Sequence, residues 1–107
     1  MRFGIVLAPG AIRALRTLPA RWRSEVRNGI ETHLRHEPRK VSKSRIKRVR
    51  GMSQPQFRLR VGEIRVFYDV TDEAVEILAI VTKAQAKEWL DEEGTPDPDS
   101  RVGGGER

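Results

Sequence analysis

The fold of this chain is decided by FRLRVGEIRVFYDVTDEAVEILAIVTK, residues 57–83, in which apolar and polar side chains alternate over successive runs. Alternation with a period of two is typical of strands that bury one face. The runs cover residues 57–61, 64–70 and 74–81. Between the first two, Gly62 can supply the positive φ that a two-residue hairpin turn requires. The stretch therefore predicts three consecutive antiparallel strands.

The predicted hairpin register sets two arginines opposite each other. With a two-residue turn after Val61, Phe57 faces Tyr68 on an apolar side, and Arg60 faces Arg65 on the other side. Like charges paired across two strands destabilise a sheet by roughly 0.2–1 kcal/mol. We therefore expect an uncovered sheet face on which a bound anion offsets this repulsion.

The third run, residues 74–81, is apolar on both sides, which is typical of an interior strand. Period two predicts that one side carries Val75, Ile77, Ala79 and Val81, and that the other carries Glu76, Leu78 and Ile80.

The remaining segments add helices to this sheet. Residues 2–7 predict a first strand, and residues 11–18 and 20–35 predict amphipathic helices separated by Pro19. Residues 84–92 predict a short last helix. The expected fold is α+β, with the order β-α-α-β-β-β-α: a small, mainly antiparallel sheet with a helical hairpin on one face.

The length of 107 residues suits one domain, which we place at residues 1–92. Residues 93–107 are rich in glycine, proline and acidic residues, so we expect a disordered tail. Residues 39–56 predict a loop with a brief extended piece around residues 46–48. Without cysteine, the chain can form no disulfide. The first apolar run is too short for a signal peptide or a membrane span, so we expect a cytoplasmic protein without a membrane partner.

Basic residues dominate the chain, whose net charge is +6. Residues 39–65 alone hold ten Lys and Arg against one acid, Glu63. A surface shaped only by solubility would mix the two signs. The dense basic segment therefore indicates a polyanion or an acidic protein as partner.

Three segments carry a resemblance to a known family: VRGM at residues 49–52, FRLRVGEIRVFYDV at residues 57–70 and VEILAIVTKAQAKEWL at residues 75–90. In this order, and with the Leu18-Pro19 joint between the helices, the chain resembles the RelE/ParE superfamily of bacterial toxins. The resemblance implies a toxin that a cognate antitoxin holds inactive. RelE-like members cleave mRNA in the ribosomal A site, whereas ParE-like members inhibit DNA gyrase and cleave nothing, so both activities stay open.

For a RelE-like ribonuclease, the resemblance implies a site on the strands. Arg65 matches the strand arginine that is functional in those enzymes, and its planar fork suits two phosphate oxygens. Arg58 and Arg60 are expected to hold the scissile phosphate together with Arg65, but neither can act as a base because a guanidinium stays protonated. Lys83 is then the expected proton carrier. No metal or other cofactor is expected.

Further residues extend this predicted site. Phosphate contacts without sequence readout are expected from a basic loop cluster. Its members are Lys40, Lys43, Arg45, Lys47, Arg48 and Arg50. Phe67 could stack on a base, as could Trp89, although a packing role suits Trp89 better. Ala84 and Leu90 stand where the enzymes often carry an arginine and an aromatic residue, which leaves an inactive antitoxin-binding relative as a third reading. A nuclease pair of His33 and His36 is disfavoured, because neighbouring helix turns do not set two imidazoles across one phosphate.

Overall fold

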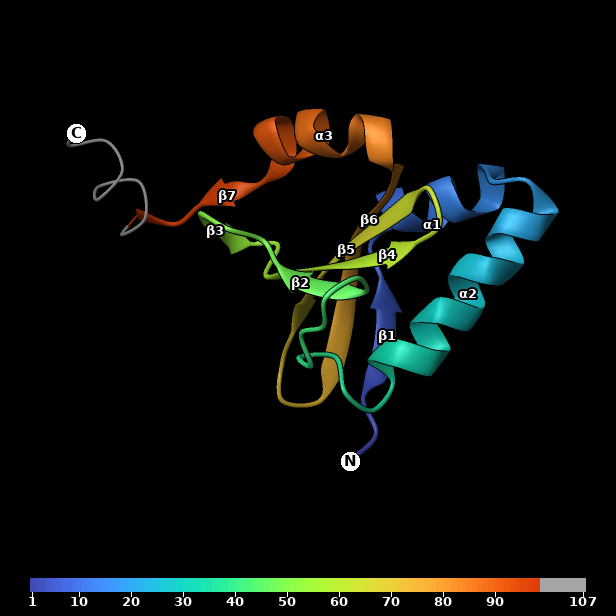
Figure 1. Cartoon of the computed structure of the whole chain (residues 1–107), viewed down its shortest axis with the longest axis horizontal. Coiled ribbons are helices and arrows are strands. Elements are labelled where there is room, and N and C mark those ends of the chain that lie inside the picture. The colour runs from blue at the N-terminus through green and yellow to red at the C-terminus, as the bar shows by residue number, and fades with distance from the viewer. Residues whose placement is uncertain (99–107) are drawn as a thin grey trace.

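A five-stranded sheet with helices on both faces forms the body of this protein, and a two-stranded sheet lies beside it (Figure 1). The computed structural model describes residues 1–98. The elements are β1 (Gly4–Leu7), α1 (Pro9–Thr17), α2 (Ala20–Leu34), β2 (Ile46–Arg48), β3 (Met52–Gln54), β4 (Phe57–Val61), β5 (Ile64–Val70), β6 (Ala74–Thr82), the 3-10 turn η1 (Lys83–Gln85), α3 (Ala86–Glu93) and β7 (Thr95–Pro96). The strand order is β1-β6-β5-β4-β2, and within this sheet only β1 and β6 pair in parallel. The predicted α+β class is confirmed.

The β4–β5 hairpin has the predicted register. Phe57 pairs with Tyr68, and Arg60 pairs with Arg65. Gly62 in the turn has a φ of 57°, the positive value that glycine adopts without a steric penalty. β6 is an interior strand, as the sequence predicts.

A β-bulge in β6 corrects the prediction for its side chains. Phe67 pairs with Ala79, whereas Tyr68 pairs with Ile77, so Leu78 is an extra residue in β6. Beyond a bulge the side-chain alternation shifts by one residue. Ile80 therefore joins Ile77 in the hydrophobic core, and the two do not lie on opposite sides.

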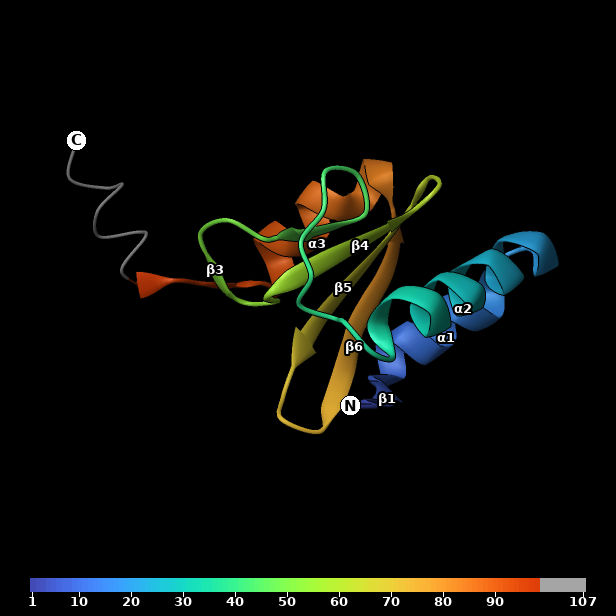
Figure 2. The same cartoon turned by 60° about the horizontal axis from the view of Figure 1, so that its bottom comes forward.

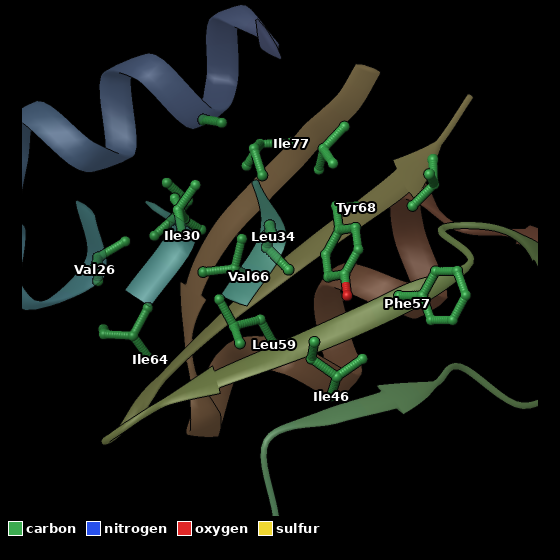
Figure 3. Packing of buried hydrophobic residues seen from close by; sticks show 14 of the residues in the cluster. Val26, Ile30, Leu34, Ile46, Phe57, Leu59, Ile64, Val66, Tyr68 and Ile77 are labelled. Carbon is green, nitrogen blue, oxygen red and sulfur yellow. The ribbon is translucent and has the colours of Figure 1, made fainter. Parts of the chain in front are cut away.

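α1 and α2 form the predicted helical hairpin and cover one face of the sheet (Figure 2). Figure 3 shows Val26, Ile30 and Leu34 of α2 facing Leu59 and Val66 of the sheet. All five side chains are buried. No helix within residues 1–98 combines the length and the apolar character that a membrane crossing needs.

The opposite face of the sheet, called the second face here, carries Arg58, Arg60, Arg65 and Phe67. The expectation that helices leave it uncovered is wrong in part, because α3 lies against it (Figure 2). The chain turns from β6 into α3 through η1. Thr82 caps this turn by accepting a hydrogen bond from the Gln85 backbone, and the Gln85 side chain accepts one from the Thr82 backbone in return.

Two segments that we expected to be irregular pair with each other. β3 lies within the predicted loop and β7 within the predicted tail, and they form a small antiparallel sheet. Asp97 also donates its backbone N–H to Gly51 O over 2.8 Å. This pairing ties the end of α3 to the loop before β4. Most of the predicted tail, residues 99–107, lies outside the described residues.

Candidate nucleic-acid interface

A cleft of about 530 Å³ opens between the second face, the loop after β2 and α3. It is lined by Lys47, Arg48, Val49, Arg50, Arg58, Arg65, Phe67, Lys83, Ala86, Lys87 and Leu90. Seven of these residues are lysine or arginine and none is acidic, so we call it the basic cleft. Low-dielectric walls lined by one sign of charge concentrate counter-ions, here anions.

Arg65 is the fixed charge in the basic cleft. Only 6% of the residue is exposed, and its Nη1 donates to Gly62 O over 2.9 Å and to Ile64 O over 3.1 Å. Burial lowers the pKa of Arg65, and the charges of Arg58 and Arg60 lower it further. A guanidinium remains protonated despite such a shift. The fold therefore holds a permanent positive charge whose position the backbone sets.

Arg58 carries an unsatisfied donor beside this charge. Its Nε is buried and has no hydrogen-bond partner within the described residues. A buried donor without a partner costs roughly 1–3 kcal/mol. In a native fold such an atom is accounted for by a bound water or ion, or by strain at a functional site. An anionic oxygen in the basic cleft would satisfy it.

The 3-10 turn and α3 supply the cations on the other wall. The backbone of Lys83 donates to Glu63 O over 2.7 Å, which fixes the start of η1 beside the β4–β5 turn. Lys87, one helical turn later, lines the same cleft and pairs with Asp91 at 3.1 Å. Lys83 has no such carboxylate partner within residues 1–98.

Comparison with solved structures identifies the fold. Escherichia coli RelE, a mutant in the free state, superposes with a TM-score of 0.66 at 22% identity, covering 86% of this chain and 94% of RelE. This chain has the RelE toxin fold. RelE of the RelE–RelB complex from Pyrococcus horikoshii gives 0.65 at 23% identity, covering 79% and 99% of the two chains. A chain of the RelBE2 toxin–antitoxin complex of Mycobacterium tuberculosis gives a TM-score of 0.63 at 26% identity, covering 77% of this chain and 99% of its own. No family model and no curated protein sequence matches the chain.

This RelE-like fold divides the arginines that we predicted to act together. Arg58 and Arg65 line the basic cleft with Lys83. Arg60 is exposed and lines a neighbouring groove with Arg45, Ser44 and Gly62. Opposite residues in a strand pair thus send their guanidinium groups to different surface depressions.

The predicted basic loop cluster is divided in the same way. Lys47, Arg48 and Arg50 line the basic cleft, and Arg48 also lies over the Phe57 ring at 5.1 Å. Arg45 and Lys40 lie on the other side of the edge strand β2. Lys40 lines a cavity there with His33. Lys43 is exposed in the loop between them.

The stacking role predicted for Phe67 is corrected by the position of α3. Phe67 is only 1% exposed, and the Trp89 ring stacks on it at a centroid distance of 5.1 Å. Phe67 therefore supports α3 and leaves no face for a base. Leu90 lines the basic cleft, whereas Ala84 is exposed in η1.

Two contributors were missed by the sequence analysis. Lys87 lies four residues after Lys83, a spacing that places two side chains on the same side of a continuous helix and could have signalled it. Asp69 is buried and accepts from Gln54 Nε2 over 2.7 Å and from the Gln56 backbone N–H over 2.8 Å. It fixes the segment between β3 and β4 against the second face. No sequence signal distinguishes Asp69 from an ordinary strand acid, because its partners come from the predicted loop.

Proposed function

We propose that this chain is the toxin of a toxin–antitoxin pair and a ribosome-dependent mRNA endoribonuclease that inhibits translation. The observation that carries this proposal is the basic cleft, whose lining within residues 1–98 contains no acid. In it the buried Arg58 Nε, which has no partner among the described residues, lies beside the fixed charge of Arg65. The RelE fold and the toxin–antitoxin complexes among its structural neighbours support the toxin role.

The chemistry proposed for the cleft is attack of a ribose 2′-oxygen on the adjacent phosphorus. The 2′-O–P bond forms and the P–O5′ bond breaks, which leaves a 2′,3′-cyclic phosphate and a 5′-hydroxyl. Arg58 and Arg65 hold the non-bridging oxygens and stabilise their added charge, a contribution worth several kcal/mol in a preorganised site. The Lys83 ammonium donates a proton to the departing 5′-oxygen.

The proton of the 2′-hydroxyl needs an acceptor that the arginines cannot supply, because guanidinium stays protonated. We assign this step to a water or an RNA group of the ribosomal A site, which also orients the message. Correct orientation alone can lower a barrier by several kcal/mol. The proposal thereby explains why activity should require the ribosome.

An antitoxin is the proposed protein partner. A depression of about 620 Å³ on the helical hairpin combines an apolar floor with a basic rim. Its floor comes from Ile5, Leu7, Ile12, Leu15 and Ile30, and its rim from Arg16, Arg27 and Arg35, with Glu31 beside Arg35. An amphipathic acidic segment matches both features, as in groove recognition of amphipathic helices. The structural neighbours include toxins solved with RelB and DinJ antitoxins.

The experiment compares wild type with Arg65→Ala and Arg58→Ala during translation of a defined message on purified ribosomes, and maps new 5′ ends. We expect cuts with wild type and a loss of at least about 100-fold in either variant, as for removal of one transition-state donor. Arg21→Ala, an exposed helix residue outside the cleft lining, is the matched control and should cut like wild type.

Two other outcomes identify the alternatives. Inhibition of gyrase supercoiling without any RNA cuts would overturn the nuclease proposal in favour of a ParE-like inhibitor. Neither activity, with an intact fold and antitoxin binding, would identify an inactive relative. Ala84 and Leu90 would explain this last outcome, because RelE-like enzymes often carry an arginine and an aromatic residue at these positions.

A further inference from the structure

We infer that a second phosphate-binding site lies beside the basic cleft, in the groove around Arg45 and Arg60, and that it holds the continuing strand of a single-stranded RNA bound in the cleft. The inference rests on the proposed function, because it concerns the path of the same RNA. We call this surface the Arg45–Arg60 groove. It consists of the depression lined by Ser44, Arg45, Arg60 and Gly62 and the cavity that adjoins it.

Arg45 and Arg60 are held together by their backbones. The N–H of Arg60 donates to Arg45 O over 2.9 Å, at the end of the β2–β4 pairing. Two arginine side chains therefore leave neighbouring backbone positions at one sheet edge. A pair of guanidinium groups in this arrangement suits a phosphate, which accepts several hydrogen bonds at once.

Hydrogen bonds within the loop hold the backbone that carries Arg45. Ser42 Oγ accepts from the backbone N–H of Arg45 over 3.0 Å and from that of Ile46 over 3.2 Å. The Ser42 N–H in turn donates to Ile46 O over 2.9 Å. Binding to a preorganised loop loses less conformational entropy than binding to a mobile one.

The charge of this groove is not neutralised within the part of the chain that the structure describes. Within residues 1–98 neither Arg45 nor Arg60 forms an ion pair. The acid that lines the adjoining cavity, Glu37, is paired with Lys40 at 3.7 Å. His33 lines the same cavity, and burial lowers its pKa, which the charge of Arg45 lowers further. An anion bound beside Arg45 would offset the second of these effects.

The groove continues the basic cleft along β4. Arg58 and Arg60 are two residues apart on the same side of β4, so their Cα atoms lie about 7 Å apart. That spacing is comparable with the distance between neighbouring phosphates of an extended strand. Arg60 also stands opposite Arg65 of the cleft. An RNA strand whose scissile phosphate lies at Arg58 and Arg65 therefore reaches Arg60 and Arg45 within one or two nucleotides.

RNA fits this groove better than an acidic protein segment does. An amphipathic segment needs an apolar floor, and the depression at Arg60 is lined by serine, glycine and two arginines. In the adjoining cavity only Ile46 is a large apolar residue, and it is buried in the core. The apolar depression lies elsewhere, on the helical hairpin.

The test measures binding of 2′-O-methyl oligouridylates, which cannot be cleaved by 2′-hydroxyl attack, to the full chain by fluorescence anisotropy. A 2-mer, which has a single phosphate, fills the basic cleft alone, whereas a 12-mer reaches the groove as well. We expect Arg45→Gln and Arg60→Gln each to weaken 12-mer binding about fivefold and to reduce its salt slope by about 0.7, the value for one single-strand phosphate contact. The 2-mer affinity should change less than about twofold, and Arg21→Gln should change neither.

Equal losses on both oligomers in the Arg45→Gln and Arg60→Gln variants, or no loss on either, would overturn the inference. Arg58→Gln tests the cleft separately, and it should weaken binding of both oligomers by the same factor. If it does not, the result counts against the proposed function and not against the groove. NMR signals of the His33 ring give a second readout. They should shift on addition of the 12-mer and not of the 2-mer, and an unshifted His33 with bound 12-mer would contradict the predicted path.

Discussion

Trp89 stacks flat on Phe67, with ring centroids 5.1 Å apart and planes inclined by 8°. This contact joins α3 to the second face of the sheet, and α3 supplies one wall of the basic cleft. An aromatic pair contributes roughly 0.5–1.5 kcal/mol beyond the area that it buries. The shape of the cleft therefore depends on two aromatic rings that touch no ligand in our proposal.

Replacing Trp89 with alanine should loosen α3. We expect Trp89→Ala to lower the free energy of unfolding by about 2 kcal/mol, less than for a fully buried tryptophan because the residue is half-buried. Urea denaturation measures the change. Trp89→Phe keeps a stacked ring and should lose less than half as much. Wild-type stability in Trp89→Ala would show that α3 is held by β3 and β7 alone.

Arg58 should be unfavourable for stability and favourable for binding. Its buried Nε lacks a partner among the described residues, and its charge faces that of Arg65. Arg58→Met keeps an unbranched side chain and removes both costs, so we expect the free energy of unfolding to rise by about 1 kcal/mol. RNA affinity should fall in the same variant. A loss of stability in Arg58→Met would show that the charge is satisfied in the free protein.

Gly29 allows α2 to approach β4 closely. A Cβ at Gly29 would lie 2.9 Å from Val61 Cγ2. Alanine in a helix interior normally gains about 1 kcal/mol over glycine, but overpacking costs typically 1–3 kcal/mol. We expect Gly29→Ala to lower stability, measured by urea denaturation. In a Val61→Ala background the contact is gone, and the same substitution should raise stability. An increase already in the wild-type background would contradict the packing argument.

His33 should make stability depend on pH. Burial lowers its pKa, and the charge of Arg45 lowers it further. An unfolded histidine titrates near a pH of about 6.5, so as pH falls through this value the unfolded state binds the proton first and stability decreases. His33→Gln should remove part of the loss measured between pH 7.5 and pH 5. Parallel pH profiles of stability for wild type and His33→Gln would show that other groups cause the loss of stability at low pH.

Much of the central sheet could be predicted from side-chain alternation. The pairing of Phe57 with Tyr68 and of Arg60 with Arg65 follows from period two and a glycine turn, which are properties of adjacent residues. The interior position of β6 follows from its apolar character on both sides. The density of basic residues between 39 and 65 predicted a surface for a polyanion or an acidic protein, and the lining of the basic cleft draws on that segment.

The errors concern contacts between segments that are distant in sequence. Phe67 was expected to be uncovered because local alternation places it on a charged face, but a helix nearly twenty residues later covers it. The pairing of β3 with β7 joins two segments that contain too few apolar residues to show a strand pattern. No sequence pattern indicates the bulge at Leu78 either, since both sides of β6 are apolar.

The amino-acid order by itself determined the hairpin register, the helical hairpin and the excess of positive charge, because each depends on neighbouring residues and on short-range sterics. Only the tertiary structure decided which arginines share a cleft. Arg58 and Arg65 meet there while Arg60 turns to the next groove, because the position of α3 and of the loop before β2 divides one charged face into two depressions.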